Sequence, residues 1–250
     1  MKPARFITIP PSHYCEKARW ALDHANVKYV EEGHPPLVHW AFTLPRTRTR
    51  TVPILLRDGA RPLVDSSDIL RFCDEQLAEE KKLFPRDCAA EVAALEDQFD
   101  EELGIATRRL TYCYVARNAK LFHAAFAHGM SNAERWIVLH GDGLLRAVLR
   151  KAFNVSDRAR DRTRAKVEAQ FAAVSEKLAD GRPYILGDRF TAADLTFVAL
   201  SNPVLMMGQR VDYIESLDAG FAELVRSMRA TPAGAFAMRL HAEHRRPSGP

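Results

Sequence analysis

A serine, a tyrosine and a cysteine lie within four positions of each other near the start of the chain, in the stretch Ser12-His13-Tyr14-Cys15. The residues that follow carry alanine and leucine at helical spacing, so Ser12 and Cys15 fall at the start of a predicted helix. A hydroxyl there either caps the helix or donates a hydrogen bond to a bound group. A thiol there is either an inert buried residue or a nucleophile. Which chemistry applies depends on the elements that position these side chains.

Strand-like and helical segments alternate over the first 78 residues. A β-rich segment, a helix and a second β-rich segment follow one another, which predicts a parallel βαβ unit. These segments are residues 4–9, 14–26 and 27–31. We then expect a basic, proline-containing connection at residues 33–50 and a hairpin at residues 52–64. Asp65 or Ser66 caps the next predicted helix.

From about residue 87 the chain is rich in alanine, leucine and arginine at helical spacing, and no strand-like alternation appears. This change of pattern predicts two folded parts. We expect an α/β domain over residues 1–79, a linker at residues 80–87 and an all-helical domain over residues 88–250.

The composition is that of an ordinary globular protein. Of the 250 residues, 47% are apolar and 27% are charged, and the net charge of +4 is too weak to indicate nucleic acid. The four cysteines and nine histidines show no spacing typical of a metal site, and no apolar run is long enough to span a membrane. We therefore expect a cytoplasmic protein with free thiols that binds no metal, no nucleic acid and no membrane.

Three motifs in a fixed order resemble the cytosolic glutathione transferases, in particular their serine-type, bacterial-like members. They are S-x-x-C-x-K-x-R-x-A-L from residue 12, TVPIL from residue 51 with VDSSDIL from residue 64, and YILGDRFTAADLTFVAL from residue 184. The resemblance implies a thioredoxin-like domain followed by an all-helical domain. It also implies glutathione as a co-substrate and a homodimer.

In the family that these motifs resemble, a cis peptide bond before proline turns backbone groups toward glutathione. The resemblance places that bond at Val52–Pro53, and the alternative is a trans proline on an edge strand. It also implies that Asp65 and Ser66 hold the γ-glutamyl end of glutathione at a helix N-terminus. The alternative for this pair is an ordinary helix cap.

The resemblance makes Ser12 the catalytic residue, a donor that keeps the glutathione thiol ionised. Cys15 is then either an inert apolar residue or the thiol of a glutathione-dependent oxidoreductase. Many relatives carry a lysine just before the valine–proline pair, whereas this chain has Thr51. We therefore expect an arginine from the preceding basic run, with Arg50 as the candidate, to meet the glycine carboxylate of glutathione.

A small hydrophobic electrophile is the expected second substrate, and the first long helix of the second domain is expected to line its pocket. Candidates for that pocket are Tyr14, Arg108, Thr111 and Tyr112, of which the last three have the spacing to share one helix face. Core packing is the alternative for these aromatic residues. Thr191 and Asp194 have the form of a capping box and are expected to be structural.

The sequence thus predicts a glutathione transferase, with two alternatives. The first is a module without catalysis that binds glutathione, an apolar ligand or a protein. The second is a thiol oxidoreductase that uses Cys15. Ser12 and the Asp65–Ser66 pair favour the transferase.

Overall fold

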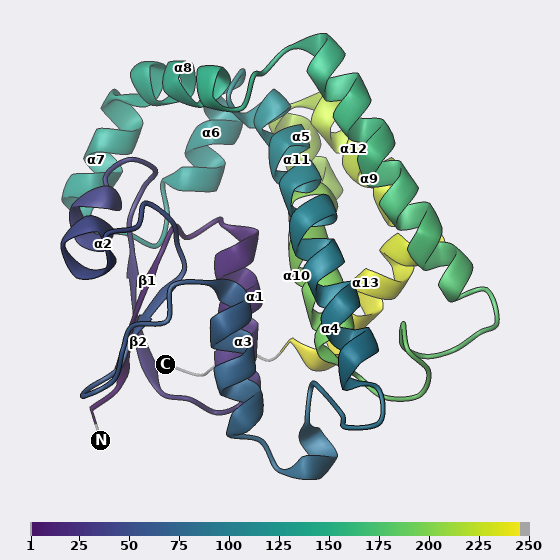
Figure 1. Ribbon diagram of the computed structural model, residues 1–250. Helices are drawn as coiled ribbons and strands as arrows, with labels where there is room; N and C mark the ends of the chain where they lie inside the picture. Colours follow the sequence, from purple (N-terminus) through teal and green to yellow (C-terminus); the bar gives the residue numbers. More distant parts are fainter. Residues whose placement is uncertain (1, 246–250) are drawn as a thin grey trace. The chain divides into compact units, whose positions relative to one another are not determined.

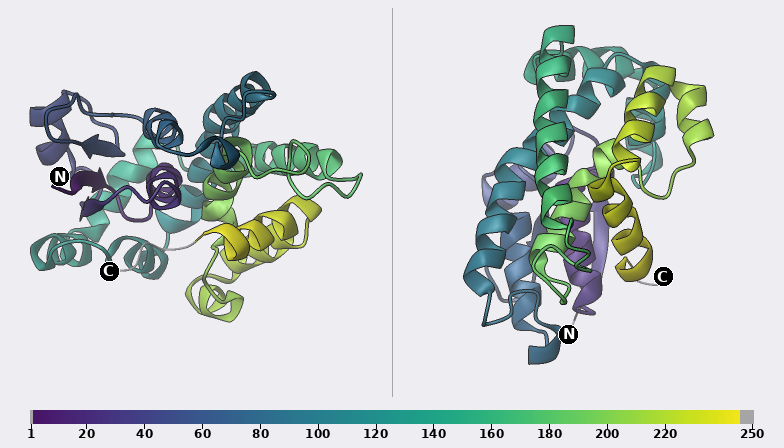
Figure 2. Two further views of the ribbon diagram at one scale, coloured as in Figure 1. Left: turned by 90° about the horizontal axis from the view of Figure 1, so that it is seen from below. Right: turned by 90° about the vertical axis from the view of Figure 1, so that its right-hand side faces the viewer.

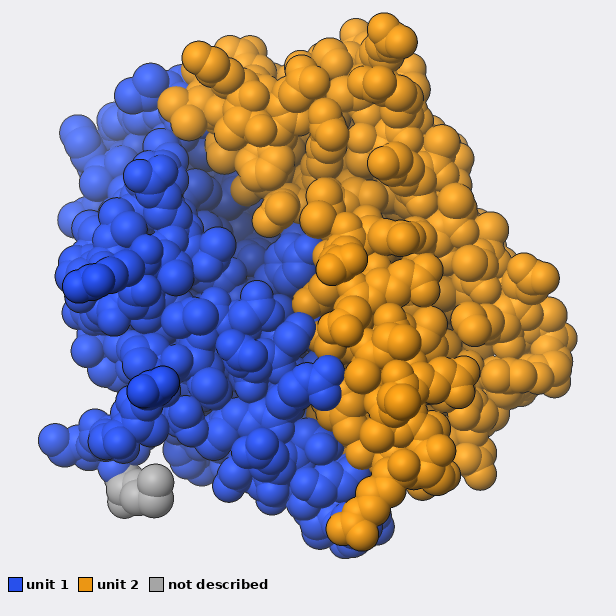
Figure 3. Space-filling view, in the orientation of Figure 1, with its two compact units in different colours: residues 1–82, 122–145, 246–250 blue, residues 83–121, 146–245 orange. Residues whose placement is uncertain are grey.

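The computed structural model describes residues 2–245, and the contacts among them divide the chain into two compact units. Unit 1 holds residues 2–82 and 122–145, and unit 2 holds residues 83–121 and 146–245; Figure 3 colours the two. The expected domains also included residue 1 and residues 246–250, which lie outside the described residues.

A small mixed sheet forms the centre of unit 1. Its strands are β1 (Ala4–Thr8), β2 (Tyr29–Gly33) and β3 (Ile54–Leu56), in the order β2-β1-β3. β1 is parallel to β2 and antiparallel to β3, as a βαβ unit followed by a returning strand requires. The second half of the expected hairpin is reduced to a single bridge between Leu55 and Leu63.

Two helices cover this sheet, α1 (His13–His24) and α3 (Ser66–Glu75), and they pack against each other. In α1, Ala18, Ala21 and Leu22, which predicted an apolar face, are fully buried together with Trp20, whereas Ala25 is the half-buried C-cap. In α3 the buried positions are Ile69, Leu70 and Cys73. The helical period of the buried residues in both segments accounts for their packing.

The connection expected at residues 33–50 is not irregular, because it contains helix α2 (Trp40–Thr47). Pro45 lies inside this helix and removes a backbone donor, which is why the segment has the pattern of a loop. Two side-chain hydrogen bonds join this helix to the residues that follow it. Buried Thr43 donates from Oγ1 to the Thr49 carbonyl at 2.9 Å, and His39 Nε2 lies 2.9 Å from the Arg50 carbonyl.

Residues 122–145 group with unit 1, although the sequence placed them in the all-helical domain. They contain the end of α6 (Ala119–Phe126), all of α7 (Asn132–His140) and the start of α8 (Asp142–Ala152). His34 Nδ1 lies 2.5 Å from Glu134 Oε1, and a Cβ atom on Gly33 would lie 2.0 Å from the Gly129 carbonyl oxygen. Only a glycine at position 33 permits this approach.

Unit 2 is helical. Its longest elements are a continuous helical segment, α4 (Ala89–Gln98), a π-helical turn η2 (Phe99–Gly104) and α5 (Ile105–Val115), and the helix α9 (Asp157–Lys177), which packs along α5 (Figures 1 and 2). The remaining helices are α10 (Ala192–Leu205), α11 (Val211–Leu217), α12 (Ala219–Arg229) and α13 (Pro232–His244). Among residues 2–245, no helix combines the length and apolar character that crossing a membrane requires.

Helix α10 forms the core of unit 2, because every residue from Ala192 to Leu200 is buried. Its N-terminus carries the predicted capping box, which the structure confirms. Asp194 Oδ2 accepts from the Thr191 amide at 2.8 Å and from the Thr191 hydroxyl at 2.9 Å. Asp194 Oδ1 accepts from the Ile185 amide at 2.8 Å, so the carboxylate also fixes the preceding loop.

Candidate functional site

Ser12 is the N-cap of α1 and lies half-buried at the end of the loop that follows β1. Its Oγ accepts from the Cys15 amide at 3.4 Å, which is long for such a bond. Its hydroxyl also interacts with the Cys15 thiol, whose pKa this contact acts to lower. Ser12 therefore combines a weak cap with a hydroxyl that is able to donate to a ligand.

Asp65 and Ser66 form the start of α3 and have different surroundings. Asp65 is exposed and caps the helix, with Oδ1 accepting from the Ser67 amide at 2.8 Å. Ser66 is buried as the first residue of the helix. One Asp65 carboxylate oxygen thus remains beside the amides of the first turn, where the helix dipole favours an anion.

A buried lysine joins the two helix starts. Lys17 has no exposed surface, and its Nζ donates to Ser67 Oγ at 3.0 Å. Figure 1 shows that α1 and α3 begin at the same end of the pair, as this bond requires. The N-termini that carry Ser12 and Asp65 therefore lie on one side of unit 1.

The Val52–Pro53 bond is cis, which confirms the prediction for this peptide bond. Pro53 is buried, Val52 is half-buried, and β3 begins at the next residue, Ile54. Because β3 pairs with β1, whose carboxyl end leads to Ser12, this peptide belongs to the same unit as both helix starts.

Arg50 is exposed, and its guanidinium carbon lies 5.0 Å from the centre of the Trp40 ring. This distance is within the range of a cation–π contact. The Arg50 carbonyl is fixed by His39, whose pKa is lowered by burial, so the neutral imidazole is favoured. The backbone at Arg50 is thus held while its guanidinium stays at the surface.

Cys15 is fully buried among the residues of α1. Burial raises the pKa of its thiol to about 11, although the hydrogen bond with Ser12 acts in the opposite direction. A thiol with that pKa is protonated at neutral pH and is a poor nucleophile. Tyr14 is half-buried, with its ring centre 4.4 Å from that of His13.

In the second turn of α1, Arg19 forms a charged network with two glutamates. It bonds Glu31 in a bidentate manner, with Nε–Oε2 at 2.9 Å and Nη2–Oε1 at 2.7 Å, and it also pairs with Glu16. Although burial lowers the pKa of Arg19, Glu31 and Glu16 raise it above its ordinary value. Arg19 therefore ties α1 to β2.

The three α5 residues proposed for the electrophile pocket lie within one turn of the helix, as their spacing predicts, but their side chains have different partners. Tyr112 stacks on Phe153 with ring centres 4.2 Å apart, and the Arg108 guanidinium carbon lies 5.6 Å from the same ring. Thr111 instead donates to the Pro203 carbonyl at 3.0 Å. That carbonyl lies in the last turn of α10, where helix carbonyls lack intrahelical donors, so Thr111 is occupied structurally.

Sequence reasoning missed two residues around this candidate site, Lys17 and His39. Lys17 lies on the same face of α1 as the buried Ala21, so a lysine in an apolar pattern was the available signal. His39 gave no such signal, because its role depends on a hydrogen bond to a carbonyl eleven residues later.

Sequence comparison identifies the class of protein to which this fold and site belong. The family model described as glutathione S-transferase, N-terminal domain, matches residues 6–81, and the model of the C-terminal domain matches residues 157–200. The two domains occur in the expected order on one chain. The protein is a member of the glutathione S-transferase family, with a thioredoxin-like domain and a mostly helical domain. No curated protein sequence matches the chain.

Solved structures show the same fold at low sequence identity. A beta-etherase from Sphingobium sp. strain SYK-6 is 18% identical with a TM-score of 0.62, and the match covers 95% of this chain and 99% of that one. A glutathione S-transferase from Sinorhizobium meliloti is 19% identical with a TM-score of 0.62 and coverages of 99% and 95%. Maize glutathione S-transferase I, solved with an atrazine glutathione conjugate, is 16% identical with a TM-score of 0.58 and coverages of 95% and 99%.

Proposed function

We propose that the protein is a glutathione transferase in which Ser12 stabilises the thiolate of bound glutathione. The observation that carries the proposal is the Ser12 hydroxyl, which caps α1 only weakly, at 3.4 Å from the Cys15 amide, and lies at the positive end of that helix. A free thiol with a pKa near 8.5 is only about 3% ionised at pH 7. Lowering that pKa by about two units needs about 2.7 kcal/mol, which a hydrogen bond and the positive end of α1 together supply.

Glutathione is the co-substrate in this proposal, and unit 1 offers groups for each of its ends. Asp65 pairs with the ammonium of the γ-glutamyl end, while Ser66 and the first amides of α3 bind its carboxylate. The cis Val52–Pro53 segment offers backbone hydrogen bonds, and Arg50 offers a cation for the glycine carboxylate. The family match supports this assignment of ligand.

The second substrate that we propose is a small hydrophobic electrophile. Arg108 and Tyr112 lie against Phe153 and form an aromatic surface with one cation, which suits an apolar or aromatic compound. Tyr14 is the fourth candidate for contact with this substrate. The maize relative was solved with a conjugate in which atrazine is joined to glutathione, which supports an organic second substrate of this general kind. A homodimer is proposed as well, on the resemblance to the family.

The two alternative functions differ in what supports them. A thiol oxidoreductase would need Cys15 as a thiolate, and the burial that raises its pKa to about 11 argues against this chemistry. A glutathione-binding module without catalysis would need no donor for the sulfur. The Ser12 hydroxyl at the start of α1 favours the transferase over that module.

Glutathione titrations of the wild type and S12A test the proposal. Thiolate absorbance followed against pH gives the pKa of the bound thiol, and calorimetry gives the affinity. We expect a thiol pKa lowered by about two units in the wild type and restored toward 8.5 in S12A, with binding retained.

S156A is a matched control, because Ser156 caps α9 in the same way and accepts from the Ala159 amide at 3.2 Å. S156A removes a similar helix cap and should leave the pKa of the bound glutathione thiol unchanged. Binding with an unshifted pKa in the wild type would reduce the protein to a glutathione-binding module. If glutathione does not bind at all, it is not a co-substrate of this protein.

A further inference from the structure

Exposed apolar side chains are concentrated in one short stretch of the chain, the α7–α8 segment of residues 132–152. Among residues 2–245, eight large hydrophobic side chains are exposed, and four of them lie between residues 136 and 144. They are Trp136, Ile137, Leu139 and Leu144, and the exposed fractions of Trp136 and Leu144 are 62% and 73%. A cluster of this kind on a folded protein marks a surface that binds a partner.

The inward side of the segment is well packed, so the exposure does not come from a loosely attached helix pair. Glu134 and Val138 of α7, four residues apart, are buried, and so are Leu145 and Leu149 of α8. Glu134 Oε1 lies 2.5 Å from Nδ1 of buried His34, which joins α7 to the end of β2. The residues of α7 that face away from this side are therefore held outward.

The exposed charges of the segment are positive. Its exposed cations are Arg135, Arg150 and Lys151. Its two carboxylates are engaged by neighbours. Buried Glu134 accepts from the Ser131 hydroxyl at 2.6 Å as well as binding His34, and half-buried Asp142 has Oδ2 at 3.7 Å from His123 Nε2. The outward surface of the segment is therefore apolar and basic.

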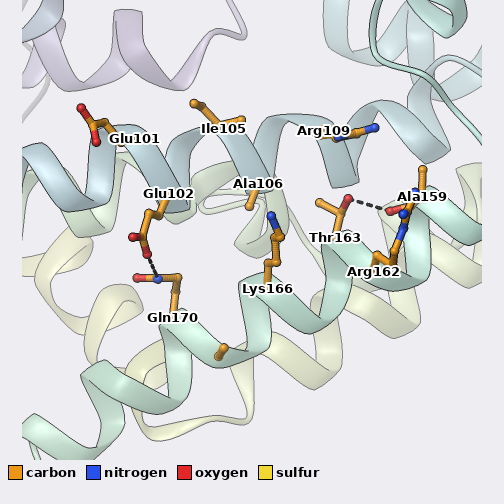
Figure 4. Close-up of a pocket in the computed structure, with 11 residues that line it drawn as sticks. Glu101, Glu102, Ile105, Ala106, Arg109, Ala159, Arg162, Thr163, Lys166 and Gln170 are labelled. Atoms are coloured by element: carbon orange, nitrogen blue, oxygen red, sulfur yellow. Dashed lines mark hydrogen bonds between the residues drawn. The ribbon is translucent and has the colours of Figure 1, made fainter.

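Exposed hydrophobic residues in other helices have acidic neighbours. Ile105 of α5 lies at the edge of a pocket between η2–α5 and α9, beside Glu101 and Glu102 (Figure 4). Tyr213 of α11 directly follows Asp212. The combination of exposed apolar and basic side chains is therefore a property of the α7–α8 segment and not of exposed hydrophobic residues in general.

The charge of this surface favours an anionic lipid surface over a second copy of the chain. In a two-fold contact each surface meets its own copy, so basic side chains would face basic side chains, which repel. Anionic headgroups instead attract the cations, while apolar side chains of the same helices enter the boundary between headgroups and acyl chains. Tryptophan is enriched at that boundary, because its ring is apolar and its N–H is polar.

We propose that the α7–α8 segment docks on the surface of an anionic membrane. Trp136, Leu139 and Leu144 enter the headgroup boundary, and the exposed cations of the segment lie against the lipid headgroups. Attachment of this kind needs no spanning helix, and the lack of a spanning segment was the reason for expecting that the protein binds no membrane. The docking surface does not depend on the proposed glutathione chemistry.

Co-sedimentation of the intact chain with vesicles of equal parts phosphatidylcholine and phosphatidylglycerol, at low salt, tests this surface. We expect the wild type to bind, and W136A and L144A each to bind at least about fivefold more weakly, since each removes an apolar side chain from the lipid boundary. R150Q/K151Q should weaken binding about tenfold, and added salt should weaken the wild type. All four positions are exposed, so the unfolding midpoints should stay near that of the wild type.

Trp136 is also a spectroscopic probe of docking. The chain has three tryptophans, of which Trp20 is buried and Trp40 is half-buried. A change of surroundings on lipid binding is therefore expected mainly at Trp136. Tryptophan emission should shift to shorter wavelength when anionic vesicles are added. W136F should still sediment with the vesicles and should show no such shift.

Y213A is the matched control, because Tyr213 is an exposed aromatic residue of α11, outside the segment. It should change vesicle binding by less than about twofold. Equal losses in Y213A and W136A, equal binding to vesicles of phosphatidylcholine alone, or a wild type that does not bind the anionic vesicles would overturn the proposal. So would a lower mass of W136A than of the wild type by light scattering, since a second copy of the chain would then cover this surface.

Discussion

Two helices of this protein, α3 and α10, begin with an aspartate that accepts backbone hydrogen bonds, and the two carboxylates have opposite surroundings. Asp65 at α3 is exposed and accepts one such bond, from the Ser67 amide. Asp194 at α10 has no exposed surface and accepts from the Ile185 amide and from the amide and hydroxyl of Thr191.

The difference shows how the same residue type serves structure in one place and remains available for a ligand in another. Every hydrogen bond of Asp194 goes to the fold, so the residue has no capacity left for a substrate. One Asp65 carboxylate oxygen accepts the capping hydrogen bond, and the other is exposed to water at a helix start whose dipole interacts with charged groups. Three measurements, on D194A, D194N and D65N, test whether the two carboxylates differ in this way.

The largest effect is expected for D194A. The substitution leaves three donors without an acceptor in a buried loop, and we expect the free energy of unfolding to fall by about 3 kcal/mol or more. Urea denaturation at pH 7 measures this. D68A in the exposed first turn of α3 is the control and should stay within about 0.5 kcal/mol of the wild type. An equally stable D194A would mean that water replaces the carboxylate.

The pH dependence of stability tests whether burial or hydrogen bonding dominates at Asp194. Burial raises its pKa to about 6, although the bonds from Ile185 and Thr191 act in the opposite direction. Since the folded pKa lies above the unfolded value near 3.9, the stability that Asp194 contributes is complete at low pH and falls as the pH rises from about 4 to 6.

We therefore expect the wild type to gain about 1 kcal/mol relative to D194N on going from pH 7 to pH 5. Parallel denaturant titrations of the two proteins measure the difference and cancel the contributions of other groups. A difference of the opposite sign would mean that the three donors lower the pKa of Asp194 below its ordinary value.

The smallest effect on folding is expected at Asp65. Asparagine caps a helix about as well as aspartate, so D65N should keep the unfolding midpoint. It removes the charge that faces the glutathione ammonium, and we expect glutathione affinity to fall about tenfold. Calorimetry and thermal denaturation on the same samples separate the two effects. Unchanged affinity would make Asp65 a cap only, like Asp194.

Much of the local structure follows from the sequence. The helix starts at Ser12, Asp65 and Thr191, the parallel βαβ order and the cis Val52–Pro53 bond were all predicted and are observed. The roles of Ser12, Asp65 and Arg50 toward glutathione remain predictions. The electrophile pocket also remains a prediction, and the hydrogen bond from the Thr111 hydroxyl to a carbonyl of α10 is a contact that the sequence pattern did not indicate.

The sequence by itself determined where helices begin, which faces they bury and which family the motifs resemble, because caps and apolar periods depend on residues within one or two turns. Only the tertiary structure decided that residues 122–145 pack on unit 1 and that Lys17 joins α1 to α3. The His34–Glu134 pair spans 100 residues and the Lys17–Ser67 bond spans 50. Such pairs form only when packing brings distant backbone segments together, so no pattern within a short segment predicts them.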